Sequence, residues 1–185
     1  MESLTKNKQN RETISKMVEK YFSPLKMKNY RELTEGYFNI AYEIHLSNEE
    51  QVILKIAPLK EMRVMTYEKN IMSSEVEAMK LAIRHGEIPV PKMMGYDDSC
   101  TICNSPYFFM EKLEGKSLNT IKDSLSSEQI NRIHVETGEI NKRINDILCP
   151  VFGYPGQPEF QGKEWYPIFR KMMEAGVNDA QHGNV

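Results

Sequence analysis

The fold is decided by residues 33–57, LTEGYFNIAYEIHLSNEEQVILKIA. Within this stretch, residues 41–46 and 52–57 show the alternation and β-branched content of strands, and a short polar turn joins them. Another strand precedes residues 34–39, a connection that contains a single glycine, Gly36. The predicted order is therefore strand, glycine-containing turn, strand, hairpin and strand.

Lys55 is an unusual residue for the last of these strands. Because side chains alternate between the two faces of a strand, Lys55 shares its face with Ile53 and Ala57, while the other face is aliphatic. An unpaired ammonium group between apolar neighbours is costly. The sequence therefore predicts an anionic partner for Lys55.

Two glutamates of a predicted helix over residues 75–84 are candidates for this partner. The apolar stripe of the helix consists of Val76, Met79 and Ile83. At roughly 100° per residue, Glu75 lies about 70° from the centre of the stripe and Glu77 about 130° from it. Glu77 also fits a capping box that begins at Ser74. We therefore predict that Glu75 pairs with Lys55; the alternative is an acidic residue favoured only by the helix dipole.

Composition limits the classes of protein. The chain has 185 residues, of which 40% are hydrophobic, enough for a packed core. A net charge of −2 and a pI near 6.1 argue against nucleic-acid and anionic-membrane partners. The polar opening residues, 1–16, resemble neither a signal peptide nor a membrane span.

From these polar opening residues we expect a cytoplasmic protein, and three cysteines fit a reducing compartment. Only Cys100 and Cys103 have the spacing of a metal site. A structural zinc site needs four ligands, and the sequence offers no second pair. We therefore expect both cysteines in a hairpin connection, with no bound metal.

The remaining segments follow from the same periodicities. They are helices over 11–22, 126–148 and 165–180, strands over 92–96 and 107–110, and a loop over 152–162. Ser126 and Gln129 form a capping box at the start of the second of these helices. The sequence thus predicts five strands with one helix inserted after the third.

Taken together, these segments resemble the aminoglycoside phosphotransferase family of small-molecule kinases, which includes choline-kinase-like and homoserine-kinase-like enzymes. The match covers residues 31–120 and rests on the order of its elements. The matching stretches are EGYFNIAYEI (35–44), VILKIA (52–57), SSEVEAMKLA (73–82), IPVPKMMGY (88–96) and PYFFMEKLEGKSL (106–118).

The resemblance implies an α+β, protein-kinase-like fold with a five-stranded antiparallel N-lobe sheet and one inserted helix. It divides the chain into a nucleotide-binding N-lobe (1–110), a hinge (111–118) and the first helices of an incomplete, truncated helical C-lobe (119–185). One departure is the turn at Gly36, which lacks the G-x-G-x-x-G pattern of protein kinases. The resemblance is therefore to small-molecule kinases.

The resemblance also implies nucleotide-binding roles for particular residues. By position these are Lys55, Glu75, Gly36, Tyr37, Phe38, Asn39, Met110, Glu111 and Leu113. Lys55 would hold the α- and β-phosphates with Glu75 as its partner, and the turn from Gly36 would cover the phosphates. Met110 would lie at the back of the adenine pocket, with the Glu111 carbonyl and the Leu113 N–H as adenine contacts.

The activity implied is transfer of a phosphoryl group from ATP (or GTP), with Mg²⁺, to a hydroxyl of a small molecule. We find no catalytic residue within the chain and expect the aspartate base downstream of Val185, so the chain alone is expected to be inactive. The tail His182-Gly183-Asn184 has an asparagine where the base would stand. Asp179 is interpreted as a surface residue at a helix end.

Two other interpretations stay open. One is a catalytically silent kinase-like module that binds a nucleotide or a partner. The other is an interaction domain in which Lys55 and Glu75 form an ordinary ion pair. The sequence leaves the phosphate acceptor, the choice between ATP and GTP, and the oligomeric state undetermined.

Overall fold

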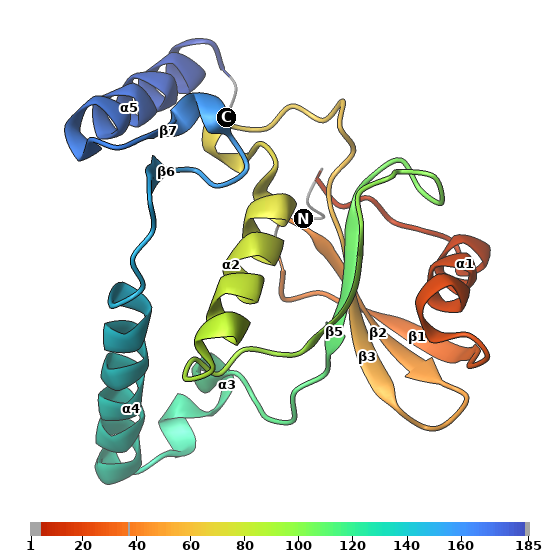
Figure 1. Cartoon of the computed structure of the whole chain (residues 1–185). Coiled ribbons are helices and arrows are strands. Elements are labelled where there is room, and N and C mark those ends of the chain that lie inside the picture. Colours follow the sequence, from red (N-terminus) through yellow and green to blue (C-terminus); the bar gives the residue numbers. More distant parts are fainter. Residues whose placement is uncertain (1–4, 37, 184–185) are drawn as a thin grey trace.

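The structure, a computed structural model, describes residues 5–36 and 38–183, and an antiparallel sheet lies at its centre (Figure 1). The five strands of this sheet run in the order β1-β2-β3-β5-β4. They are β1 (Met27–Leu33), β2 (Ile40–Leu46), β3 (Gln51–Ile56), β4 (Met93–Asp97) and β5 (Tyr107–Glu111). The predicted five-stranded antiparallel sheet is thus confirmed. Its central strand, β3, is covered on both faces, which explains why both faces are apolar.

Helix α1 (Arg11–Phe22) covers one face of the sheet, where the larger part of the core lies (Figure 1). Asn10 caps this helix by accepting a hydrogen bond from the Thr13 N–H at 2.9 Å. Its inner face buries Ile14, Met17 and Val18. The sheet side chains packed there are Ile40, Tyr42, Ile44, Leu46, Val52, Leu54, Ile56, Tyr107 and Phe109.

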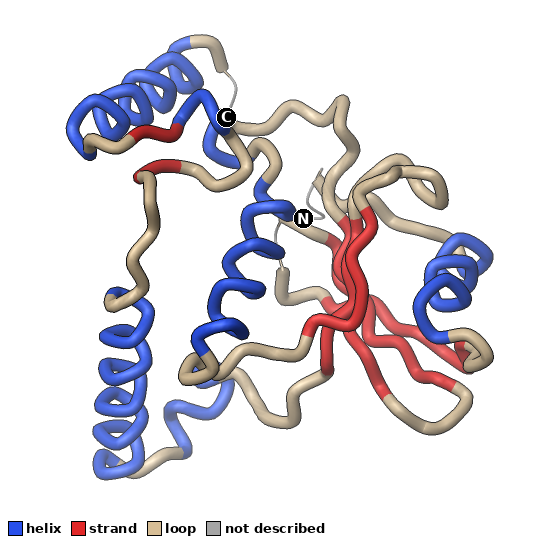
Figure 2. Tube along the Cα trace, in the orientation of Figure 1, coloured by secondary structure: helices blue, strands red, loops and turns tan. Residues whose placement is uncertain are grey.

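Helix α2 (Ile71–His85) lies against the opposite face (Figures 1 and 2). Its buried residues include Met72, Val76 and Met79, which pack with Ala57 and Phe108. Ile83, predicted to belong to the apolar stripe, is exposed. The stripe includes Met72 instead because the helix begins one turn earlier than the sequence indicated.

The predicted capping box at Ser74 is wrong. The residue before α2 is Asn70, which adopts the left-handed conformation that asparagine tolerates better than most residues. Ser74 and Glu77 are therefore interior helical residues. Glu77 accepts a hydrogen bond from Lys80 at 2.8 Å on the exposed surface, which removes it as a partner of Lys55.

The C-terminal part is mainly helical. It contains α3 (Leu118–Ile121), α4 (Ser127–Asn145) and α5 (Trp165–Gln181). The capping box of Ser126 and Gln129 at the start of α4 is confirmed. Where the sequence predicted only a loop, β6 (Phe152–Gly153) and β7 (Gln161–Gly162) pair as a short hairpin. A Cβ on Gly153 would meet the carbonyl oxygen of Phe160 at 1.7 Å, so this pairing depends on glycine.

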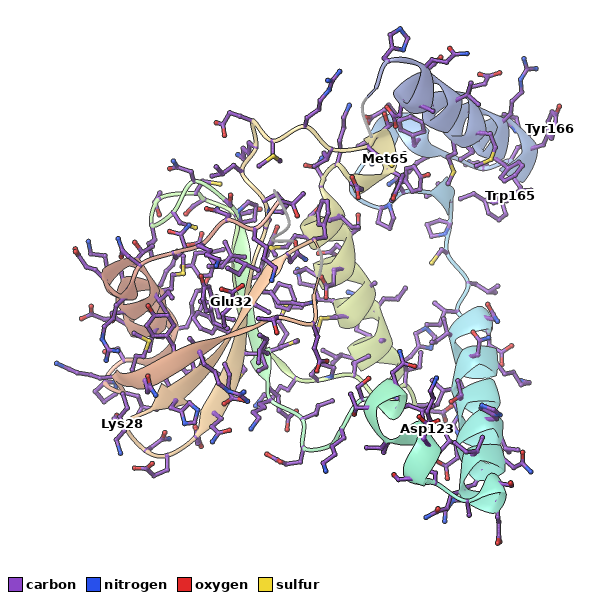
Figure 3. The ribbon with its side chains drawn as sticks, turned by 180° about the vertical axis from the view of Figure 1, so that it is seen from behind. Lys28, Glu32, Met65, Asp123, Trp165 and Tyr166 are labelled. Carbon is purple, nitrogen blue, oxygen red and sulfur yellow. The ribbon has the colours of Figure 1, made fainter. Side chains whose placement is uncertain are left out.

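Helix α5 packs beside the connection between β3 and α2, which contains the short 3-10 helix η1 (Thr66–Glu68). In Figure 3 Met65, just before η1, lies close to α5, whereas Trp165 and Tyr166 project from the far end of α5. Asp179 is only 5% exposed because it accepts hydrogen bonds from Thr66. Its interpretation as a surface residue is therefore wrong.

Candidate functional site

The Lys55 side chain lies on the face of the sheet that α2 covers. Its cross-strand neighbours are Ala41 on β2 and Phe108 on β5. The Nζ atom lies 5.6 Å from the centroid of the Phe108 ring, within the range of a cation–π contact. The side chain is 25% exposed. The ammonium group is thus held against the sheet but is still open to a ligand.

Glu75, one turn into α2, is the anionic partner of Lys55. Its Oε1 atom accepts a hydrogen bond from Lys55 Nζ. The Glu75 side chain is 31% exposed, so solvent screens the pair, and its contribution to stability is on the order of 1 kcal/mol or less. A lysine has three N–H donors, so this pairing leaves donors for an anionic ligand. The ion pair predicted from the sequence is present; its role towards a nucleotide stays a prediction.

The connection between β1 and β2 carries the residues expected to cover phosphates. Gly36, Phe38 and Asn39 are described, whereas Tyr37 lies outside the described residues. The Phe38 carbonyl accepts a hydrogen bond from the Thr5 hydroxyl at 3.0 Å, so the turn is tied to the N-terminal segment. The Asn39 Oδ1 atom is buried and has no hydrogen-bond partner among the described residues. This atom is an acceptor without a donor, so it offers nothing directly to a phosphate oxygen.

A cavity of about 350 Å³ opens beside this turn. Phe38 lines it together with the end of β3 at Ala57, the connection to α2, and Met72 of α2. Lys60, Lys69 and Glu68 also line the cavity, so its wall carries charges of both signs. Lys55 does not line the cavity, although Ala57 is the next residue on the same strand face. The cavity therefore adjoins the ion pair and does not contain it.

The residues expected to contact adenine lie at the far end of β5. Met110 is partly buried and pairs across the sheet with Ile53. The Glu111 N–H donates to the Lys92 carbonyl at 2.9 Å, and the Glu111 carboxylate accepts from the Lys92 N–H at 3.2 Å. Leu113 is exposed. The adenine contacts of the Glu111 carbonyl and the Leu113 N–H stay predictions.

A second charged group on this face was missed from the sequence. Glu43 is only 4% exposed, yet its carboxylate accepts two hydrogen bonds from Arg31, at 3.0 and 2.9 Å. The His45 Nε2 atom lies 2.9 Å away and the Lys112 Nζ atom 3.4 Å away. The hydrogen bonds from Arg31, helped by His45 and Lys112, outweigh burial and lower the pKa of Glu43 to about 2.

The alternation of β2 indicated the face on which Glu43 lies, but not its partners. Glu43 follows Ala41 by two residues, so it shares the face of Lys55. Lys112 directly follows β5, and its contact with Glu43 ties the start of the expected hinge to the sheet. The Lys55 face thus has an ion pair near the turn and a charged cluster near the hinge.

The described residues form no group of three or more histidine, cysteine, aspartate or glutamate side chains that could hold a metal ion. Cys100 and Cys103 are free thiols in the connection between β4 and β5. Among the helices of residues 5–36 and 38–183, none is long and apolar enough to cross a membrane.

Comparison with known sequences gives two findings. A sequence model described as the phosphotransferase enzyme family matches residues 29–182. Subtelomeric hrmA-associated cluster proteins from two strains of Aspergillus fumigatus are each 28% identical over 123 residues. That alignment covers 65% of this chain and 23% of each fungal protein, so the chain spans less than a quarter of these curated relatives.

Solved structures similar to this chain include two phosphotransferase complexes. The GDP complex of aminoglycoside 2′-phosphotransferase-IIIa has a TM-score of 0.57 at 15% identity, covering 76% of this chain and 43% of that one. The GDP and kanamycin complex of APH(2″)-IIIa has a TM-score of 0.56 at 13% identity, covering 73% and 42%. At these identities the likeness concerns the fold, and it confirms the α+β, protein-kinase-like arrangement expected from the sequence.

Proposed function

The chain belongs to the phosphotransferase enzyme family, and from this premise we propose that it is the nucleotide-binding portion of a small-molecule kinase. The reaction proposed for the whole enzyme is transfer of the γ-phosphoryl group of ATP or GTP to a hydroxyl group of a small molecule. The observation that carries the proposal is the ion pair of Lys55 on β3 with Glu75 on α2.

The chemistry of the Lys55 ammonium group suits a phosphate. Phosphoryl transfer depends mainly on positioning and on neutralising phosphate charge. Lys55 supplies one positive charge at a fixed place, because β3 is the central strand and Phe108 supports the side chain. Glu75 holds the ammonium group in one direction while leaving two donors for the α- and β-phosphates.

The other proposed contacts divide between the two ends of the sheet face. The turn at Gly36, Tyr37, Phe38 and Asn39 would cover the phosphates, next to the cavity of about 350 Å³. At the other end, Met110 would lie behind the purine ring of the nucleotide, and the Glu111 carbonyl and the Leu113 N–H would bind the edge of that ring. Lys112, between these two backbone groups, contacts Glu43, which favours a fixed hinge.

The transfer step needs groups that the described residues do not bring together. A kinase of this kind requires an aspartate near the substrate hydroxyl, and oxygen ligands for Mg²⁺. Residues 5–36 and 38–183 gather no such set of carboxylates. For the described residues we therefore propose the nucleotide-binding part of this reaction only.

Both phosphotransferase structures similar to this chain hold GDP, and one also holds kanamycin. These ligands favour a purine nucleotide and a polyhydroxylated or amino-sugar acceptor as the first compounds to test. A cytoplasmic location, expected from the sequence, is part of the proposal.

The test is calorimetric titration of the chain with ATP and with GTP, each with magnesium. Lys55→Ala should weaken binding about tenfold or more, because charge-assisted hydrogen bonds to the phosphates are lost. The matched control is Lys80→Ala, which removes a lysine of α2 itself whose partner is the exposed Glu77. Equal affinities of wild type and Lys55→Ala would exclude Lys55 from the site.

Turnover separates the proposal from its alternative, a catalytically silent kinase-like module that binds a nucleotide or a partner. Saturable binding by the chain and phosphoryl transfer by a longer protein that contains it would support the kinase. Binding by both, with no transfer to any hydroxyl acceptor, would support the silent module.

A further inference from the structure

The start of α2 is held by residues that lie far away in the sequence. Asp179 on α5 accepts two hydrogen bonds from Thr66, one from the N–H at 2.7 Å and one from the hydroxyl at 2.9 Å. Thr66 opens η1, and only a short link separates η1 from the first residue of α2, Ile71. A carboxylate that accepts both donors of one residue fixes the position and the orientation of that residue.

Residues 154–157 form a second attachment at the same place. The Gly156 N–H donates to the Ser74 hydroxyl at 2.9 Å, and the Gly156 carbonyl accepts from the Asn70 side chain at 3.0 Å. The side chain of Gln157, only 1% exposed, donates to the Thr66 carbonyl at 2.9 Å. These bonds reach Ser74, the residue directly before Glu75.

Gly156 shows how closely this loop approaches the helix. A Cβ at this position would lie 2.8 Å from both the Asn70 carbonyl oxygen and the Ser74 hydroxyl. Contacts this short are not tolerated, so any other residue would separate the loop from α2. The close approach therefore requires glycine.

We propose that Asp179 and residues 154–157, here named the clasp, set the position of the first turn of α2 and thereby the ion pair of Lys55 and Glu75. Asp179 is in this sense a positioning residue for Glu75. The consequence for a nucleotide rests on the function proposed above, whereas the effect on the ion pair does not.

The physical reason lies in the two kinds of contact that α2 makes. Lys55 is fixed by the central strand, whereas Glu75 moves with its helix. The inner face of α2 packs on the sheet through Met72, Val76 and Met79, and such apolar contacts are not directional. Hydrogen bonds are directional, and those at the start of α2 determine the position of the helix along its own axis relative to the sheet. In the clasp, Gly156 supplies such bonds to Asn70 and Ser74, within about one turn of Glu75, while Asp179 fixes Thr66 of η1, the 3-10 helix that precedes α2.

The test measures the chemical reactivity of the Lys55 amine and needs no nucleotide. Trace acetylation of the folded chain compares the reactivity of Lys55 with that of Lys16, an exposed lysine on α1. Loss of the Glu75 partner should raise the ratio of Lys55 reactivity to Lys16 reactivity about three- to fivefold, as expected for a partly exposed ion pair. Glu75→Gln gives the highest ratio expected, that of Lys55 without its partner. We expect the ratios of Asp179→Ala and Gly156→Ala to approach it.

Matched variants separate positioning from a general loss of structure. Gly176→Ala adds a Cβ on the same helix as Asp179 with nothing within 4 Å, so the ratio should not change. Thr66→Val keeps the N–H bond and the side-chain volume but loses the hydroxyl bond, and should raise the ratio about twofold at most. Thr66→Ser keeps both donors, so its ratio should equal that of the wild type.

Amide hydrogen exchange over residues 71–78 provides the second measurement. Exchange should accelerate in Asp179→Ala and Gly156→Ala and stay at the wild-type rate in Gly176→Ala. An unchanged Lys55 ratio and unchanged exchange in folded Asp179→Ala and Thr66→Val would overturn the proposal.

Nucleotide titration of the same variants distinguishes the two proposals. If the wild type binds ATP or GTP, Asp179→Ala should bind it several-fold more weakly. If the wild type binds neither nucleotide while the Lys55 ratio still responds to the clasp variants, the clasp stands and the nucleotide site fails.

Discussion

The two ends of the chain contain similar amphipathic helices with different surroundings. Helix α1 buries its apolar residues in a core that includes Phe109 and Tyr107, whereas none of the residues of α4 is buried. In α5 only Ile168 and Asp179 are buried. The large apolar side chains exposed on α4 and α5 are Val135, Ile144, Trp165, Tyr166, Phe169, Met173 and Val177.

The comparison shows that an apolar stripe predicts a helix but not a packed helix. The isoleucines of α4 recur at helical spacing just as the apolar residues of α1 do. Burial requires a complementary surface, and within residues 5–36 and 38–183 the sheet provides one for α1 and α2 only. Equivalent substitutions in the two parts should therefore have different effects.

The largest expected difference concerns phenylalanine. Phe109 is fully buried, with its ring centroid 5.0 Å from that of Phe22, and Phe109→Ala should lower the free energy of unfolding by about 3–5 kcal/mol. Phe169 is exposed, and Phe169→Ala should cost about 1 kcal/mol or less. Urea denaturation monitored by circular dichroism measures both. Equal losses would mean that α5 is as well packed as the sheet.

The second difference concerns carboxylates and pH. The Arg31 hydrogen bonds hold the pKa of Glu43 at about 2, below its value in an unfolded chain. The stabilisation is therefore fully present above about pH 4.5 and is lost as the pH falls towards 2; it amounts to about 3 kcal/mol. Urea denaturation between pH 7 and pH 2.5 should show this loss in the wild type and a smaller one in Glu43→Gln.

The control for this prediction lies on α4. Glu136 forms an exposed ion pair with Arg132 at 2.8 Å, and Glu136→Gln should change stability at pH 7 by less than about 0.5 kcal/mol. A pH profile of Glu43→Gln that matches the wild type would show that other carboxylates govern acid unfolding.

The smallest expected effects are those of added methyl groups. A Cβ on Gly95 would lie 2.3 Å from the ring of Tyr21, whose hydroxyl is fixed by a 2.6 Å bond to the Tyr96 carbonyl. Gly95→Ala should therefore destabilise the protein by about 1–3 kcal/mol. Gly138 lies inside α4 with nothing within 4 Å of a Cβ, and Gly138→Ala should stabilise the helix by up to about 1 kcal/mol. Thermal melts show whether each substitution raises or lowers the melting temperature. A rise for Gly95→Ala would contradict the close packing of β4 on α1.

Much of the sheet could be predicted because its signals are local. The alternation of residues 41–46 and 52–57 gave both strands to within one residue of β2 and β3. The pairing of Lys55 with Glu75 could also be predicted, since it follows from the face of a strand and the angle around a helix. Capping boxes are local too, and the one at Ser126 was correct.

The errors arose where a distant segment decides a local structure. Helix α2 begins at Ile71 and not at Glu75, where the apolar pattern alone placed its start, and its first turn is bonded to residues 154–157. Asp179 was assigned to the surface because nothing near it in the sequence indicates that α5 lies beside Thr66.

The sequence by itself determined most of the strands and the ion pair of Lys55, because side-chain periodicity and the cost of an unpaired charge act over a few residues. Only the tertiary structure decided the cluster of Arg31 and Glu43, which depends on the register of β1 against β2. It alone decided the clasp on α2 and the exposure of α4. Contacts between residues far apart in the chain leave no periodic pattern in the sequence, because they depend on how whole helices and strands are arranged in space.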